Sequence, residues 1–308
     1  MSGAILIGVS YLFLAVFVVA FVARSLKIAR MPVHLRWELA PVPHERGKGG
    51  YGGSYLEEPE WWSKPRDKDH LAEVIYMAKE IGFLKALFEH NRRLWFFSFP
   101  FHFGLYLLSA MAGLVVIGGI AQLFGFADTG LGVLGRVVVV LGGAGYALGA
   151  VGALGVFFSR LLDPKMRTIA TPLTFINLIL LFAFFVTGAL AVFTLTGFPS
   201  AMSGFVGALL TFDGAVAVPG VLAAHLILAG LFLAFLPFTP MMHFVAKYFT
   251  YHQVRWDDAP LEAGGKMEKE IQELLQQPVS WAAPHLGADG TKNWVDIATS
   301  TSKKEAEQ

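Results

Sequence analysis

The stretch HLILAGLFLAFLPFTPMMH, residues 225–243, is apolar, as long as a membrane-spanning helix, and has a histidine at each end. Eighteen residues at about 100° each complete five turns, so a continuous helix would carry His225 and His243 on one face, roughly 27 Å apart along its axis. Ionisable side chains are costly in hydrocarbon and generally mark a functional path. The pair therefore predicts a membrane helix with a histidine near each membrane surface.

The composition places the rest of the chain in a bilayer as well. Of its 308 residues, 55% are hydrophobic and 15% are charged, which is too apolar for a soluble protein. Crossing about 30 Å of hydrocarbon takes roughly 20 apolar residues. Five stretches are long enough: 4–23, 97–125, 137–159, 172–196 and 219–246. We expect an all-α integral membrane protein of five transmembrane helices, with a membrane domain over 1–250 that includes a cytoplasmic loop at 24–93, and a cytoplasmic tail over 251–308.

Lysine and arginine predict the direction of these helices. Thirteen of them lie between the first and second stretches, whereas Arg136 stands alone between the second and third. Because cytoplasmic loops carry the excess of positive charge, we expect the N-terminus outside and the C-terminus inside. This predicts a multi-pass protein of the inner (cytoplasmic) membrane, in which the second helix runs outward and the fifth runs inward.

The absence of cysteine limits the chemistry. Without it the chain cannot hold a disulfide or a cysteine-ligated iron–sulfur cluster. The sequence has no phosphate-binding loop or dinucleotide motif, and its net charge of +1 gives no indication of nucleic acid. Any redox chemistry must therefore use another cofactor and a partner protein.

A histidine near the inner end of the second stretch can pair with the fifth helix. His102 lies in FPFHFGLYLLSAMAGL, and because the two helices run in opposite directions it falls at the depth of His243. Neutral imidazole is a strong iron ligand, and a haem between helices takes one histidine from each. We predict an inner-leaflet haem b with His102 and His243 as axial metal ligands.

Basic residues surround this depth. Arg92 and Arg93 precede the second helix, and Lys247 follows His243 by one turn. These cations could contact the haem propionates. Ordinary positive-inside anchoring explains them equally well.

A different histidine pairing is also open. His90 could pair with His243, which would leave His102 to pair with His225. However, His90 stands among charges in LFEHNRRLW, where a solvated side chain is the default.

The sequence resembles the cytochrome b (gamma) subunit of respiratory nitrate reductase and its relatives in heterodisulfide-reductase-like membrane complexes. The resemblance covers about residues 1–250 and rests on five spans, FHFG opening the second helix, and LPFTPMMH closing the fifth. It implies that His102 and His243 bind the haem nearer the cytoplasmic partner. It also implies that His225 matches a ligand of a distal haem, whose other ligand lies about ten residues after the first histidine.

The sequence departs from the family pattern at that other ligand. Ala112 stands ten residues beyond His102 and cannot coordinate iron. His225 then packs without haem, holds a five-coordinate haem, or pairs with a side chain such as Met111. We expect one haem b and leave a second open.

The polar segments suggest a partner. Residues 31–67 are long and rich in Pro, Gly and Trp, with Trp37, Trp61 and Trp62, and residues 69–93 read as an amphipathic helix. We expect a docking surface for a cytoplasmic iron–sulfur subunit, with a loop at the lipid headgroups as the alternative. In the tail, KMEKEIQELLQQ predicts a short helix and TSTSKKEAEQ predicts disorder.

These features predict a subunit of a respiratory oxidoreductase that is incomplete on its own. It would exchange electrons between menaquinone or ubiquinone in the bilayer and the iron–sulfur partner, as in anaerobic respiration. The alternatives are an assembly or anchor subunit that has lost electron transfer, and a transporter. A transporter should show polar residues near the midplane, and the spans contain little of that kind beyond Asn177 and the histidines.

The quinone site is the least determined feature. The resemblance places a basic residue at the outer end of the third helix, where Arg136 lies, and Asp128 or Asp213 could accept protons nearby. If only one haem is present, the quinone should instead react deeper, among the second and fifth helices.

Overall fold

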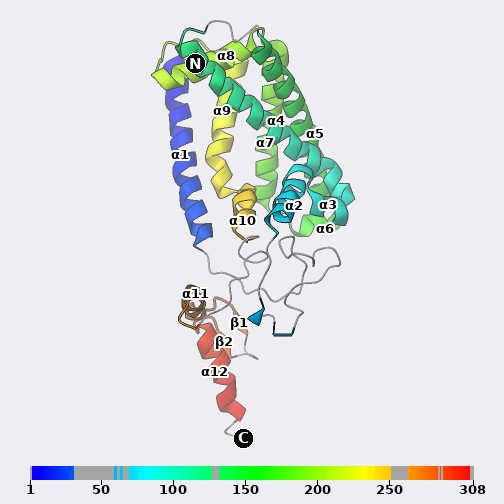
Figure 1. Cartoon of the computed structure of the whole chain (residues 1–308), viewed down its shortest axis with the longest axis vertical. Coiled ribbons are helices and arrows are strands. Elements are labelled where there is room, and N and C mark those ends of the chain that lie inside the picture. Colours follow the sequence, from blue (N-terminus) through cyan, green and yellow to red (C-terminus); the bar gives the residue numbers. More distant parts are fainter. Residues whose placement is uncertain are drawn as a thin grey trace. The chain divides into compact units, whose positions relative to one another are not determined.

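The computed structural model describes residues 2–30, 59–60, 63–64, 69–126, 132–250, 263–283, 285 and 287–305. Five of its helices are long and apolar enough to cross a membrane. They are α1 (Gly3–Ala29), α4 (Arg92–Leu123), α5 (Val133–Leu162), α7 (Pro172–Thr194), and α9 (Gly220–Phe235) with the short η3 (Leu236–Phe238) that continues it. Figure 1 shows them side by side. The predicted five-helix, all-α, multi-pass membrane architecture is confirmed.

The chain divides into two compact units. The first contains Met1–Arg24 and Val74–His243, and the second contains Ser25–Glu73 and Phe244–Gln308. All five spans lie in the first unit, apart from the end of α1. The candidate haem ligands on the second and fifth spans therefore belong to one unit.

Glycines bring α4 and α5 into close contact. A Cβ on Gly104 of α4 would lie 2.6 Å from the backbone nitrogen of Gly149 on α5, and a Cβ on Gly152 would lie 2.4 Å from the backbone nitrogen of Phe101. Only residues without a Cβ let two helix backbones approach so closely. This pair makes the most extensive helix contact in the described chain.

Beyond the α4–α5 pair, α7 and α9 extend the bundle in sequence order. α7 packs on α5, and α9 packs on α7. Phe185 on α7 fills the space over Gly149, while Tyr146 on α5 fills the space over Gly188. α8 (Phe198–Thr211) packs on α4 and lies across the end of the bundle where α4 finishes (Figure 1). Among the described helices, α4 and α9 do not pack along each other.

The fifth span is not one continuous helix, which corrects the expectation for 219–246. After η3 comes a second 3₁₀ turn, η4 (Pro240–Met242), and only then does α10 (His243–Thr250) begin. His225 and His243 therefore do not share one face of a regular helix.

The break follows from two prolines and a threonine. Pro237 and Pro240 lack the N–H that an α-helix needs, and Thr239 between them is extended, with φ −111° and ψ 165°. Thr239 is buried; its hydroxyl donates to the Leu236 carbonyl at 2.9 Å and accepts from the Met241 N–H at 3.2 Å. These bonds replace part of the interrupted helical pattern and hold the turn that precedes His243.

The expected amphipathic helix over 69–93 is divided. It forms α2 (His70–Phe83) and α3 (Lys85–His90), separated by Leu84 in the left-handed region at φ 52°. The Glu80 carboxylate is buried and accepts the Ala86 N–H at 2.8 Å, so it satisfies a donor in the first turn of α3.

Two hydrogen bonds tie this segment to α4. Trp95 Nε1 donates to the Phe83 carbonyl at 2.8 Å, and the Tyr106 hydroxyl donates to the Ile81 carbonyl at 2.7 Å. Apolar side chains of α2 remain exposed within this unit. The segment thus lies against the end of α4 that carries His102.

The tail has its own small core. α11 (Lys266–Leu275) confirms the predicted helix, and a two-stranded antiparallel hairpin follows with β1 (Ala282–Ala283) and β2 (Ala288–Asp289). A last helix, α12 (Trp294–Glu305), continues through most of the segment for which disorder was expected. Val279, Ala288 and Ile297 are buried together here.

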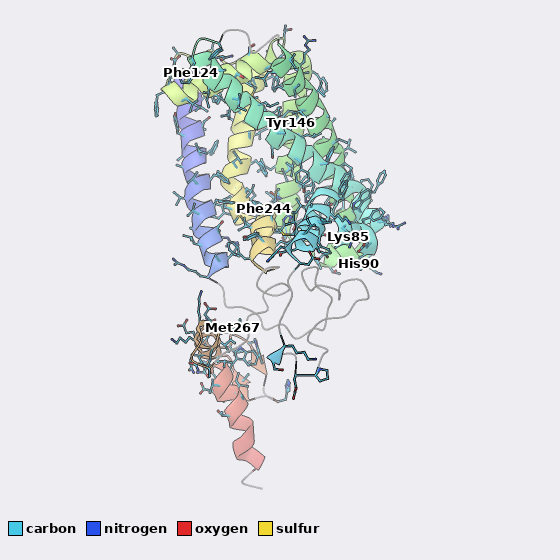
Figure 2. The ribbon with its side chains drawn as sticks, viewed as in Figure 1. Lys85, His90, Phe124, Tyr146, Phe244 and Met267 are labelled. Carbon is cyan, nitrogen blue, oxygen red and sulfur yellow. The ribbon has the colours of Figure 1, made fainter. Side chains whose placement is uncertain are left out.

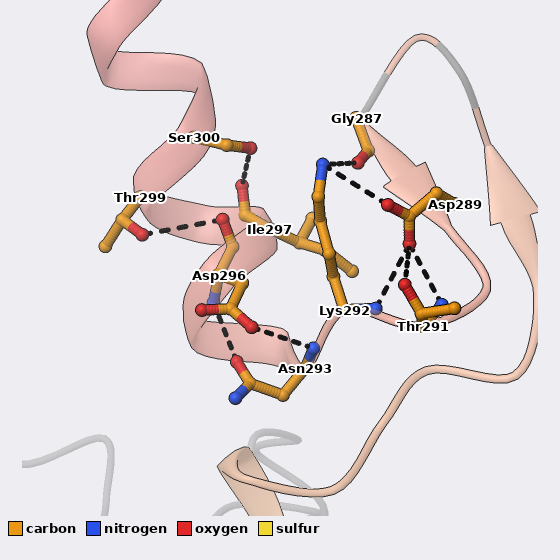
Figure 3. Close-up of polar contacts among 9 residues, drawn as sticks. All are labelled: Gly287, Asp289, Thr291, Lys292, Asn293, Asp296, Ile297, Thr299 and Ser300. Atoms are coloured by element: carbon orange, nitrogen blue, oxygen red, sulfur yellow. Dashed lines mark hydrogen bonds and ion pairs between the residues drawn. The ribbon is translucent and has the colours of Figure 1, made fainter.

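Hydrogen bonds centred on Asp289 shape the turn between β2 and α12 (Figure 3). Its carboxylate accepts the N–H and hydroxyl of Thr291 and the N–H of Lys292, at 2.9, 2.8 and 3.1 Å. Asn293 then caps α12 by accepting the Asp296 N–H.

Candidate haem and histidine sites

His102 and His243 face each other across the bundle. Their ring centroids are 6.1 Å apart and the ring planes are inclined at 77°. Two imidazoles on opposite sides of one metal ion, with metal–nitrogen bonds of about 2 Å each, have ring centres roughly 6 Å apart. The spacing therefore suits a pair of axial ligands. His243 is the first residue of α10, beyond the break that ends the fifth span, so the pair does not depend on packing of α9 along α4.

Backbone carbonyls select the tautomer of both rings. His102 Nδ1 lies 2.7 Å from the Ser98 carbonyl oxygen, and His243 Nδ1 lies 3.1 Å from the Pro240 carbonyl oxygen. A carbonyl only accepts, so each Nδ1 carries the proton and each lone pair is on Nε2. Nδ1–H donation to a backbone carbonyl is the usual support of a metal-binding histidine. The Nε2 lone pairs of these two residues are donors that haem iron accepts.

The basic residues named from the sequence are described by other contacts or lie in the other unit. The Arg92 guanidinium lies 4.7 Å above the Phe88 ring, and Arg93 lines a pocket between α4 and α5. Lys247 lies on α10 beyond His243, in the second unit. Contact of these three with haem propionates therefore remains a prediction.

His225 occupies a different kind of site. It is 2% exposed, and its Nε2 is 2.8 Å from the Tyr146 hydroxyl. Its Nδ1 is 3.3 Å from the Thr187 hydroxyl, which itself donates to the Ala183 carbonyl at 2.8 Å. Thr187 must then accept from Nδ1–H, and Nε2 must accept from Tyr146. Both ring nitrogens are engaged, and the Phe184 ring stacks on the imidazole at 5.1 Å.

Met111 is the side chain that the sequence offers as a partner of His225, because Ala112 cannot coordinate iron. Ala112 is exposed on α4. Met111 is buried on the same helix, but its sulfur packs over Gly142, 2.8 Å from where a Cβ would stand. Figure 2 shows Tyr146 among the bundle helices, nearer the end marked by Phe124 than the end marked by His90.

Sequence reasoning missed Tyr146 and Thr187. Tyr146 was visible as the one phenol in the apolar, glycine-rich span VLGRVVVVLGGAGYALGAVGALGVFF. Its pairing with His225 depends on the register of α5 against α7 and α9, which glycine packing sets. No pattern within one span carries that information.

The remaining candidates lie at the surface. His90 is exposed at the end of α3, and Arg136 is exposed in the first turn of α5. Asp213 accepts the Ala215 N–H at 2.9 Å. Asp128, Trp37, Trp61 and Trp62 lie outside the described residues.

Direct metal binding by a larger cluster has no support. In the described ranges, no three His, Cys, Asp or Glu side chains gather in a way that could hold a metal ion. A haem iron needs only two protein ligands, so the His102–His243 pair is compatible with this result.

The fold and the paired histidines define a multi-pass helical membrane protein with a bis-histidine site. The chain belongs to the nitrate reductase gamma subunit family, whose model matches residues 85–257 and so covers more than half of the sequence and both histidines of the pair. Members of this family are membrane cytochrome b subunits of a respiratory oxidoreductase complex. No curated protein gives a significant match.

Proposed function

We propose that this chain is the haem b subunit that passes electrons between a membrane quinone and a cytoplasmic iron–sulfur partner. The observation that carries the proposal is the His102–His243 pair, with ring centroids 6.1 Å apart and each Nδ1 held by a backbone carbonyl. When bound there, haem supplies one-electron chemistry.

The chain's own residues would hold that group in place. The Ser98 and Pro240 carbonyls keep Nε2 of each ring as the donor atom and increase its basicity. The close α4–α5 contact fixes the helix that carries His102. The Thr239 turn fixes the segment that carries His243.

The proposal of a partner protein rests on the absence of cysteine from the sequence. It has no cysteine for an iron–sulfur cluster, so electrons that leave the membrane need another protein to receive them. On α2, Val74 and Phe83 are exposed in the first unit, and the Phe83 carbonyl accepts the Trp95 side-chain N–H of α4. They support the proposal of a docking surface over residues 31–93. With one haem, we propose that the quinone reacts among the second and fifth spans rather than at Arg136, which lies in the first turn of α5.

The first test removes the ligands. His102→Ala and His243→Ala should each abolish the low-spin haem signal in a reduced-minus-oxidised spectrum, while the subunit stays in the membrane. His90→Ala is the matched control, because His90 is exposed at the end of α3. If the signal survives both single substitutions, the ligand assignment is wrong. If the unaltered protein has no α-band, the assembly-subunit alternative is favoured.

The hydrogen bonds of His225 support one haem rather than two. A pyridine-haemochrome assay scaled to protein should give about one haem b per chain. A ratio near two would contradict this proposal, because His225 would then have to exchange Tyr146 for iron.

A further inference from the structure

The end of α2 is attached to α4 at two points, one on each side of His102 in the sequence. The Phe83 carbonyl accepts the Trp95 side-chain N–H at 2.8 Å, and the Ile81 carbonyl accepts the Tyr106 hydroxyl at 2.7 Å. Trp95 and Tyr106 are separated by about 16 Å along α4, whereas the two carbonyls are separated by only about 3 Å along α2. The two side chains therefore reach toward each other, and the end of α2 lies at the level of the residues between them.

His102 lies on the same side of α4 as these two attachments. The helix is unbroken through this stretch. At about 100° per residue, His102 is roughly 20° from Trp95 and roughly 40° from Tyr106 around the helix. Gly104, which touches the backbone of α5, is about 160° from His102. The side of α4 that carries His102 is therefore the side that α2 covers, opposite the contact with α5.

Ring contacts support this placement. The Phe83 ring is nearly parallel to the Phe99 ring, with centroids 6.5 Å apart and planes inclined at 9°. Phe99 also stacks on Trp95 at 4.9 Å and on Phe103 at 5.7 Å, and Phe103 is the residue that follows His102. All of these residues belong to the first unit of the chain. Hydrogen bonds and a stacked ring thus hold the end of α2 beside the neighbours of His102.

Apolar side chains are exposed where α2 meets α4. Ile81 is 56% exposed, and Phe103 is 39% exposed. Haem is a largely apolar macrocycle that is much wider than an imidazole, so a haem held by two histidines also contacts the side chains around them. The surface at the end of α2 has the apolar character that such a contact needs.

We propose that the end of α2, residues 81–83, forms one wall of the haem site, and that Trp95 and Tyr106 are the positioning residues that hold it there. The proposal rests on the proposed haem ligation by His102 and His243. Such a wall excludes water from one side of the haem, and burial is one of the factors that set a haem potential. Because water stabilises the more highly charged ferric form, loosening the wall lowers the potential.

The attachments are tested in the full-length protein with its haem, in nanodiscs. The double variant Trp95→Phe, Tyr106→Phe keeps an aromatic ring at each position and removes both donors. It should keep about one haem per chain, exchange the amide hydrogens of residues 74–83 faster, and have a more negative haem midpoint potential. Tyr11→Phe is the matched control, because the Tyr11 hydroxyl donates to the Leu209 carbonyl on α8. It should leave the potential unchanged.

A charge on α2 tests proximity without breaking the attachments. Ile81→Glu should lower the potential more than Val74→Glu, because a negative charge stabilises ferric haem and its field falls with distance. Val74 lies about 10 Å further back along α2, and both side chains are exposed, at 56% and 61%.

The outcomes separate the wall from the haem ligands. Faster exchange in the double variant with an unchanged potential, equal shifts from the two glutamate variants, or an equal shift from Tyr11→Phe would overturn the wall alone. Loss of haem from the double variant would show that the attachments hold His102 itself, and would also overturn it. If the unaltered protein contains no haem, the proposed function and the wall fail together.

Discussion

The hydrogen bond between Tyr146 and His225 joins α5 to α9 in the bundle interior. Both residues are almost fully buried, at 1% and 2% exposure. At the residue level, this bond distinguishes the two membrane histidine sites. His243 donates its Nδ1–H to a backbone carbonyl, whereas His225 has both ring nitrogens hydrogen-bonded to hydroxyls.

Removal of the Tyr146 hydroxyl should destabilise the bundle. Tyr146→Phe keeps the ring but leaves a buried imidazole nitrogen without its donor, at a cost of about 1–3 kcal/mol. Thermal unfolding in detergent should show the loss, with haem content unchanged. The control is Tyr106→Phe, where the lost bond to the Ile81 carbonyl is exposed. Equal effects of the two variants, or loss of haem from Tyr146→Phe, would contradict the proposed role.

Asp289 makes the tail sensitive to acid. Hydrogen bonds from the Thr291 N–H and hydroxyl, and from the Lys292 N–H, lower the pKa of its carboxyl from the ordinary 3.8 to about 2. A lowered folded-state pKa means that the charged form stabilises the fold, so this contribution is complete above pH 3.8 and is lost as pH falls through about 2. The turn before α12 should therefore loosen in this window.

A ¹³C carboxyl titration of the full chain in nanodiscs would measure this shift. Asp289→Asn identifies the resonance by its disappearance and should remove the acid-dependent loosening. A midpoint near the ordinary aspartate value would show that the turn does not hold the carboxylate in solution.

At the scale of elements, the turn around Thr239 positions His243. Thr239→Val keeps the shape of the side chain but loses the bonds to Leu236 and Met241, which should cost roughly 1–3 kcal/mol and lower haem retention. Thr239→Ser keeps the hydroxyl and should retain haem. Haem content and unfolding temperature measure both effects. If the valine variant binds haem as well as the serine variant, the hydroxyl does not position His243.

The spans were predictable because hydrophobic length is a local property. Apolar stretches identified all five helices, and opposite helix directions placed His102 and His243 at one depth. Pro237 and Pro240 stand in the fifth apolar stretch, but the expectation of an unbroken helix took only its apolar length and histidine spacing into account. Prolines alone do not decide such a break, because neighbouring groups in a membrane protein can satisfy the freed carbonyls. Tyr146 could not be placed at His225, because their meeting depends on how Gly188 admits the Tyr146 ring between helices.

At the scale of the whole molecule, orientation in the membrane is a prediction from charge alone. The absence of cysteine makes it directly testable, because an introduced cysteine is the only thiol. In right-side-out vesicles, a membrane-impermeant maleimide should label Ala217→Cys between the fourth and fifth spans. Lys165→Cys, after the third span, should react only once the vesicles are opened. The reverse pattern would place the N-terminus inside.

The Tyr146–His225–Thr187 network also bears on energy conservation. It fills the half of the bundle where a second iron would be needed to carry electrons from the far surface. With one redox centre at the His102 end, electrons would cross only a fraction of the insulating layer during turnover. The reaction would then move little net charge across the membrane and would contribute little to the membrane potential. This subunit would connect the quinone pool to its partner without conserving energy as a membrane potential.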